Sequence, residues 1–323
     1  MHKFLILSFL FLCFANGSMA QTITKPNLKA LQKKEDSLNI LSWRISNEFK
    51  TSDRLRADSF FTRIFVRALA INNSFKYPFD SVQIAKLTAP DTAFKLFTWQ
   101  VETGKNKLRQ RGVIQYNTPD GKLIITPLID NSEYSNDLNA INDNRNWIGA
   151  IYYKILLNNH YGKKYYTLIG YDDNNTESNK KWIDVISFNE PYKPQFGAAI
   201  FNHTTKGLLN RIGIEYKKDS KIKVNYDEEQ QMIIYDHLTS ESGFVNKRST
   251  YVADGDYEGL KWNNGQWQHQ EKVMCNCPLS TKENKDKVNE SLFDNAGQKN
   301  ENKLQEKSKN NEVKQVIPKK SGF

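Results

Sequence analysis

The segment Leu260–Gln270, LKWNNGQWQHQ, has the pattern of a β-hairpin. Asn264 and Gly265 are the pair that a type I′ turn prefers, because both of its central residues need positive φ. Trp262 and Trp267 then lie opposite each other at the next, closer position. We therefore predict that the two indoles contact each other across the hairpin. An exposed platform on which sugar rings stack is the alternative role of the same pair.

Upstream of this hairpin, from Phe94 onward, the hydrophobic pattern has a period of two residues. Short segments rich in β-branched and aromatic residues are separated by turn residues, without long helical segments between them. Arg211–Lys217, RIGIEYK, alternates most clearly, which predicts one buried and one solvated face. The fold class is therefore mainly β, an antiparallel meander of about a dozen strands. A sandwich, a barrel and a propeller-like arrangement all fit this pattern.

Three turn-like segments are expected to join neighbouring strands as hairpins: TPDG at 118–121, KKDSK at 217–221 and DEEQQ at 227–231. The segment NWIGAIYYKILLNNHYG, residues 146–162, suits either a helix or a strand, because its apolar spacing fits both.

Two helices are expected ahead of the strands and should form an antiparallel hairpin. The first has apolar residues at a spacing of three to four: Leu31, Leu38, Leu41, Ile45 and Phe49. The second repeats the pattern with Leu55, Phe61, Ile64, Phe65 and Ala68. Thr51 or Ser52 is the expected N-cap of the second helix.

The two ends of the chain have a different composition from its middle. Residues 1–20 resemble a secretory signal peptide, with the apolar run Phe4–Phe14 and small residues at Ser18 and Ala20. Leu12 before Cys13 disfavours a lipid anchor. Residues 279–323 are polar, with ten lysines and seven acidic residues, and are expected to be disordered. The domains predicted are thus 1–20, a helical hairpin at 21–75, a β domain at 76–278 and the tail.

The formal charge of +10 leaves several partner classes open. Without an arginine-rich helix or an RNA-binding signature, nucleic acid is not expected to be the partner. No later segment of the sequence is apolar enough to be a transmembrane span. Cys275 and Cys277 would remain after processing, and a strained local bridge or an inter-chain bridge is expected of them in an oxidising compartment.

Assembled catalytic motifs are missing from the sequence: it has no nucleophile elbow, phosphate loop, dinucleotide fingerprint or HExxH helix. Asp236 and His237 are neighbours, but strand neighbours point to opposite faces and so do not form a dyad. We assign no catalytic residue and no metal ligand, leave the binding residues unassigned and expect no cofactor. The alternative is an exported hydrolase that uses acidic residues such as Asp184, Glu215, Asp236 or Asp256.

Two acidic segments raise the question of a bound cation. Asp172 and Asp173 lie in a loop without the glycine and the closing glutamate of an EF-hand, so a long hairpin loop is the preferred interpretation. Asp254, Asp256 and Glu258 alternate and would share one side of an extended chain. A tight turn at Asp254-Gly255 is a simpler explanation of this segment. Whether the three acidic residues bind a metal stays open.

Several segments together resemble a family of secreted proteins from Bacteroidetes-type bacteria that has no functional name. The resemblance covers roughly Leu31 to Val273 and is carried by the order of FKLFTWQ, RGVIQY, WIGAIYYKIL, YYTLIGYDDNN, IDVISF, QFGAAIF, IIYDHL and ADGDYEGLKW. It implies an exported protein of a Gram-negative cell, periplasmic or at the cell surface. We expect a non-enzymatic binding or envelope-associated protein, with a glycan or an envelope protein as partner, or else a structural assembly partner.

Overall fold

The computed structural model describes residues 22–104, 107–133 and 137–274. Residues 1–20, for which a signal peptide is expected, the C-terminal tail and the pair Cys275 and Cys277 lie outside these residues, and the predictions made for them remain predictions. The described chain begins with two helices and continues with fifteen strands. The helices are α1 (Lys25–Asn47) and α2 (Thr51–Leu69), and a 3-10 turn, η1 (Ser74–Lys76), leads into the strands.

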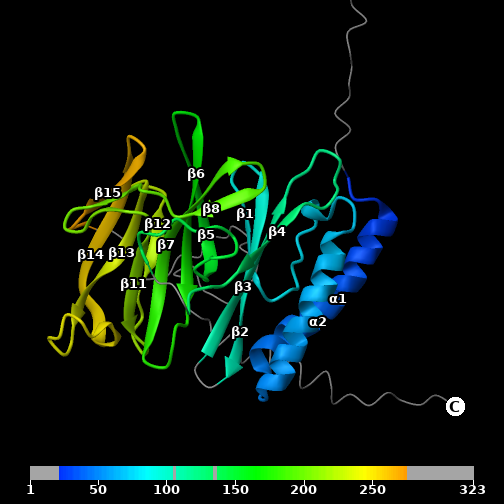
Figure 1. Ribbon diagram of the computed structural model, residues 1–323, viewed down its shortest axis with the longest axis horizontal. Helices are drawn as coiled ribbons and strands as arrows, with labels where there is room; N and C mark the ends of the chain where they lie inside the picture. Colours follow the sequence, from blue (N-terminus) through cyan, green and yellow to red (C-terminus); the bar gives the residue numbers. More distant parts are fainter. Residues whose placement is uncertain (1–21, 105–106, 134–136, 275–323) are drawn as a thin grey trace, which may run out of the picture.

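The strands form three sheets (Figure 1). The first has the order β1-β2-β3-β4: β1 (Ala85–Thr88), β2 (Phe94–Gly104), β3 (Lys107–Tyr116) and β4 (Ile125–Ile129). The second has the order β11-β7-β6-β5, with β8 paired to β7: β5 (Ile151–His160), β6 (Lys163–Asp172), β7 (Ser178–Glu190), β8 (Lys193–Phe196) and β11 (Ile212–Lys217).

The third sheet has the order β10-β9-β15-β14-β13-β12. Its strands are β9 (Phe201–His203), β10 (Gly207–Leu209), β12 (Val224–Asp227), β13 (Met232–Ser240), β14 (Tyr251–Asn263) and β15 (Gln266–Gln270); a second 3-10 turn, η2 (Arg248–Thr250), precedes β14. All strand pairs of the three sheets are antiparallel except β15 and β9, which are parallel. The prediction of a mainly β fold with N-terminal helices is confirmed, and each sheet keeps two edges instead of closing on itself.

The helices and sheets stack as four layers, with the helical hairpin at one end and the β12–β15 side at the other (Figure 1). Alternation along β2 explains the stacking: Phe97 and Trp99 contact the helices, whereas Phe94 and Leu96 face the second sheet. In the same way β7 has Trp182 towards the first sheet and neighbouring Ile183 towards the third. The second sheet is therefore covered on both faces.

The alternation predicted for 211–217 is confirmed over β11, where buried and half-exposed residues alternate, and Arg211 is the exception. Arg211 is 0% exposed, and the alternate residues of β11 are only half-exposed. The ambiguous segment 146–162 contains strand β5. Of the three expected hairpins, 118–121 joins β3 to β4 and 227–231 joins β12 to β13. Residues 217–221 instead cross from the second sheet to the third, so that prediction was wrong.

The helical hairpin packs on the first sheet through the expected stripes, with two exceptions. Phe49 is 98% exposed and Leu55 is 36% exposed. Phe49 leaves the stripe because α1 ends at Asn47, and the N-cap of α2 is Lys50 without a side-chain hydrogen bond, not Thr51 or Ser52. Buried Asp58 fixes α2 to the sheet, accepting a hydrogen bond of 2.8 Å from Trp99 Nε1 and pairing with Arg111.

The tryptophan hairpin forms as predicted. Asn264 and Gly265 have φ values of 46° and 84°, and Trp262 pairs with Trp267. The ring centroids lie 5.4 Å apart at 70°. Trp267 is 0% exposed, and its Nε1 donates to Thr167 Oγ1 at 2.9 Å. A two-ring sugar platform therefore does not exist, because one of its rings is inside the protein.

Among the residues described, neither helix is sufficiently long and apolar to cross a membrane.

Candidate metal centre

Strand pairing in the third sheet gathers histidines that are far apart in the sequence. Parallel pairing sets Trp267 beside Phe201, so His269 lies next to His203 two residues further along both strands. Antiparallel pairing sets Leu260 opposite His269, which leaves Glu258 diagonal to His269 on the same face. Because Phe201, Leu260 and Trp267 belong to the core below the third sheet, the three polar side chains lie at the rim of that core.

His203, Glu258 and His269 each offer one ligand atom, and these atoms all lie within 4.8 Å of one another. His269 Nε2 is 2.8 Å from Glu258 Oε2, and the two imidazole rings stack with centroids 3.9 Å apart. His203 is 7% exposed and His269 is 8% exposed. The three groups thus converge in a place that is largely removed from water.

The Thr204 hydroxyl fixes the orientation of the His269 ring at Nδ1, the ring nitrogen that does not face Glu258. Thr204 Oγ1 lies 2.9 Å from His269 Nδ1 and 2.8 Å from a carboxylate oxygen of Glu271. The hydroxyl has one proton, which goes to the carboxylate, so Nδ1 is the donor towards Thr204. His269 Nε2 then faces the carboxylate of Glu258, and a second ring proton or a cation must lie between these two acceptors. This arrangement resembles the outer-shell partners that orient metal-binding histidines.

The electrostatics of the cluster favour an ionised Glu258 and a neutral His203. Burial opposes ionisation of Glu258, but the hydrogen bond with His269, the Tyr235 hydroxyl and the charges of His269 and His237 together lower the pKa of the carboxyl group. Burial, together with neighbouring His269 and Lys206, lowers the pKa of His203 to about 4. The Tyr235 hydroxyl next to Glu258 is buried and has no hydrogen-bond partner of regular geometry among the described residues.

A third histidine reaches the cluster through a β-bulge. The register of β13 and β14 shifts between Asp236 and Leu238, where Gly255 has a φ of 99°. This bulge brings Asp254 to 2.6 Å from His237 Nδ1. His237 Nε2 lies 3.6 Å from Glu258 Oε1, so the two oxygens of Glu258 face two different histidines. His237 is on the solvent side of the site, with 41% of its side chain exposed.

The donor set of two imidazoles and one carboxylate suits zinc and its neighbours in the transition series. Bond lengths of about 2.0–2.1 Å would place tetrahedral ligands about 3.3 Å apart. Around an ion, the ligand atoms that now lie up to 4.8 Å apart would have to approach by up to about 1.5 Å, and His269 Nε2 and Glu258 Oε2, now 2.8 Å apart, would have to separate by about 0.5 Å. His203, Glu258 and His269 would hold the ion. His237 lies on the side from which a fourth ligand, or water, would approach.

The sequence pattern indicated only part of this site. Of Asp254, Asp256 and Glu258, only Glu258 joins the cluster; Asp254 orients His237, and Asp256 is exposed. The expected tight turn at Asp254-Gly255 is wrong, because both residues lie inside β14. The two main histidines were missed, although both follow the same pattern, an aromatic core residue, one polar residue and then histidine, in FNH and WQH.

The acidic residues of the hydrolase alternative are engaged separately. Asp184 is 2% exposed and pairs with Arg211, and Glu215 accepts a hydrogen bond of 2.6 Å from Ser178 Oγ. Asp236 accepts from the backbone nitrogen of Lys223 at 2.6 Å. As strand alternation predicts, Asp236 and His237 have different partners. Each of these three carboxylates has a structural role.

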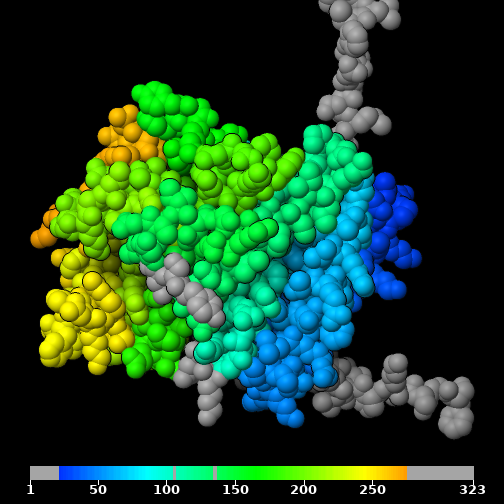
Figure 2. Space-filling view, in the orientation of Figure 1, coloured from blue at the N-terminus to red at the C-terminus, as the bar shows by residue number. Residues whose placement is uncertain are grey.

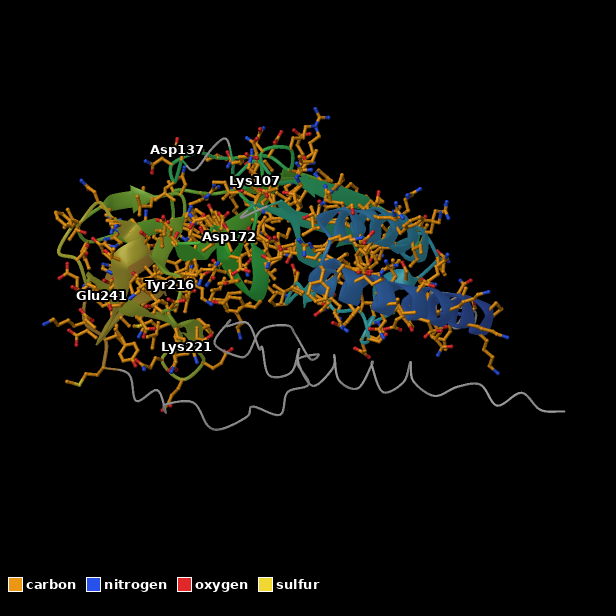
Figure 3. The ribbon with its side chains drawn as sticks, turned by 90° about the horizontal axis from the view of Figure 1, so that it is seen from below. Lys107, Asp137, Asp172, Tyr216, Lys221 and Glu241 are labelled. Atoms are coloured by element: carbon orange, nitrogen blue, oxygen red, sulfur yellow. The ribbon has the colours of Figure 1, made fainter. Side chains whose placement is uncertain are left out.

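Asp172 is unusual for its burial, with 7% of the residue exposed. It ends β6, beside the β6–β7 connection, and lies in the middle of the molecule (Figure 3). Its Oδ1 accepts from Gln110 Nε2 at 3.0 Å and from the backbone nitrogen of Asn174 at 2.9 Å. Burial raises the pKa of Asp172 to about 6, against these two hydrogen bonds and the charge of Lys180.

The raised pKa of Asp172 predicts a pH-dependent cost of folding. Between pH of about 4 and 6 the folded state binds more protons at this site than the unfolded chain, so stability falls as pH rises. Asp172→Asn keeps the Oδ1 acceptor and removes the charge. We expect it to raise the free energy of unfolding at neutral pH by up to about 3 kcal/mol, and urea unfolding across this pH range measures it. A variant as pH-dependent as the wild type would contradict this origin of the slope.

The chain was compared with known proteins. No protein-family model, no curated protein and no solved structure matches it. The resemblance to secreted proteins of Bacteroidetes-type bacteria therefore stays a prediction from the sequence.

Proposed function

We propose that the protein is exported and binds a divalent transition-metal ion, with zinc as the ion that best suits the site. The observation that carries this proposal is the convergence of His203, Glu258 and His269 from three adjacent strands. The acceptor atoms His269 Nε2 and Glu258 Oε2 face each other at 2.8 Å, and a cation satisfies both. Export, to the periplasm or the cell surface, rests on the sequence pattern of residues 1–20.

Binding without turnover is the form of this function that we propose. A hydrolase acting through Asp184, Glu215 or Asp236 is less well supported, because a buried arginine, a serine hydroxyl and a backbone nitrogen already engage these carboxylates. The metal cluster instead has the outer-shell support that retention of an ion requires, in Thr204 with Glu271 and in His237 with Asp254.

Titration of the full-length chain with Zn²⁺ against a chromophoric chelator tests the proposal. The test uses a Cys275→Ser, Cys277→Ser background, so that the cysteines outside the described residues contribute no ligand. We expect one ion per chain and a rise in melting temperature with Zn²⁺, because a ligand that binds only the folded state stabilises it. Co²⁺ in the same site should give the visible absorption of a four-coordinate nitrogen and oxygen environment.

His269→Gln is expected to weaken Zn²⁺ binding by more than about 100-fold, because losing a ligand costs more than losing an outer-shell partner. His160→Gln is the matched control, since this histidine lies at the β5–β6 turn outside the cluster. Melting temperatures measured with chelator show whether each variant is folded. Equal affinities of the wild type and His269→Gln, or no binding by the wild type, would overturn the proposal.

A further inference from the structure

The outer face of the helical hairpin carries an excess of positive charge. Among the exposed residues of 25–69 there are seven basic side chains and one acidic side chain, Asp36; the basic ones are Lys25, Lys29, Lys33, Lys50, Arg56, Arg63 and Arg67. Half-buried Glu48 is paired with Arg44, and Glu35 accepts from Tyr77. Half-buried Asp53, three residues before Arg56, offsets one of these charges, and an excess of positive charge remains on the layer. Figure 2 shows the hairpin as the outer layer at one end of the molecule.

Helix α2 concentrates the charge in one stripe. Arg56, Phe60, Arg63 and Arg67 follow one another at spacings of four, three and four residues, which places them on one side of a helix. Within the described residues, none of these three arginines forms an ion pair with a carboxylate. The guanidinium of Arg63 lies 4.8 Å from the centre of the Phe60 ring.

Apolar side chains project from the same layer. Phe49, in the loop between the helices, is 98% exposed, Ile40 is 62%, Phe60 is 46% and Val66 is 41% exposed. Apolar side chains that stand among cations on a helical surface match the interface of a bilayer with anionic lipids, where the rings enter the headgroup layer. A soluble acidic polymer would use the charges but would gain nothing from Phe49.

We infer that the outer face of α1 and α2 docks the protein on an anionic membrane surface, with Phe49 inserted at the interface and the arginine stripe on the headgroups. This inference is independent of metal binding, because the metal centre lies in the sheet at the opposite end of the molecule (Figure 1).

Sedimentation of the full-length protein with lipid vesicles tests the inference. Vesicles of equimolar phosphatidylcholine and phosphatidylglycerol should retain the protein, and pure phosphatidylcholine should not. The triple change Arg56→Gln, Arg63→Gln, Arg67→Gln should lower partition by about 100-fold, because each basic residue near such a surface contributes about fivefold. Phe49→Ser should also weaken binding, and its full exposure leaves folding unaffected.

The matched control is Lys221→Gln, Lys247→Gln, Lys261→Gln. It removes the same charge from the end of the molecule away from the helices, where Figure 3 labels Lys221. Partition of this control should stay close to the wild type, because these lysines lie beyond the Debye length from the docked face. Equal loss in both triple variants, or equal binding to the two vesicle types, would overturn the inference. Binding that free polyglutamate abolishes and that Phe49→Ser leaves unchanged would also overturn it.

Discussion

Trp267→Ala is expected to lower the free energy of unfolding by about 3–5 kcal/mol, the usual cost of replacing a fully buried aromatic residue by alanine. Trp267 is 0% exposed and belongs to the core between the second and third sheets. Its loss would open a cavity and leave the buried Thr167 hydroxyl without its donor. Urea unfolding of the two proteins measures the difference.

Trp262→Ala is the control, because Trp262 belongs to the same hairpin but is only half-buried. It should cost less than Trp267→Ala, because the change removes the aromatic pair, worth about 1 kcal/mol, and only a half-buried surface. A Trp267→Ala protein with unchanged stability and lost retention on glycan resins would contradict the structural role of this residue. Such a result would return the hairpin to a ligand-binding role.

Local sequence predicts the parts of this fold that depend on local geometry. The Asn-Gly turn fixes the register of the last hairpin, and an alternating pattern identifies strands such as β11. The stacking order of the sheets depends on pairings between distant strands, such as β15 with β9, for which the chain carries no nearby signal. For this reason, the burial of Arg211, just before β11, could not be predicted from the alternating pattern.

The candidate metal site shows the same division between local and distant information. Glu258 was noticed because it lies in an acidic segment, and Asp254 because it alternates with Glu258. Most strands of the third sheet lie between His203 and His269 in the sequence. The two residues become neighbours only because β9 and β15 pair in parallel. The bulge that turns His237 towards Glu258 also has no clear sequence pattern besides Gly255. The only sequence signal for the two histidines was an aromatic-x-His pattern in two strands. A pattern of three residues is too short to predict that the strands pair.

Buried charge is the other feature that the sequence did not reveal. Arg211 and Asp184 are 0% and 2% exposed, and Arg211 Nε lies 3.4 Å from Asp184 Oδ1. A second guanidinium nitrogen donates to the carbonyl oxygen of Phe196 at 3.0 Å. Each buried charge carries a large desolvation cost, which the attraction to its partner offsets. Removal of one partner leaves the other charge buried and uncompensated, and this destabilises the protein. Burial raises the pKa of Asp184, and Arg211 opposes that rise.

Arg211→Met should therefore destabilise the protein by about 3–5 kcal/mol at neutral pH, because it leaves the Asp184 carboxylate buried without a counter-ion. The pKa of Asp184 in the folded variant rises further above its unfolded value. The folded variant consequently takes up a proton as pH falls towards about 4, and the deficit should shrink there. Unfolding by urea at neutral and at acidic pH measures both effects.

The double variant Asp184→Asn, Arg211→Met separates charge from packing. Asparagine keeps the Oδ1 atom that accepts from the Val185 backbone nitrogen at 2.8 Å, but it has no charge to bury. The double variant should recover much of the stability lost by Arg211→Met, and the additional pH dependence that Arg211→Met introduces between about pH 4 and 7 should disappear. If Asp184→Asn restores nothing and the deficit is equal at both pH values, the loss comes from the volume of the arginine side chain. The pair would then act by filling space between the sheets, and its charge would be incidental to the fold.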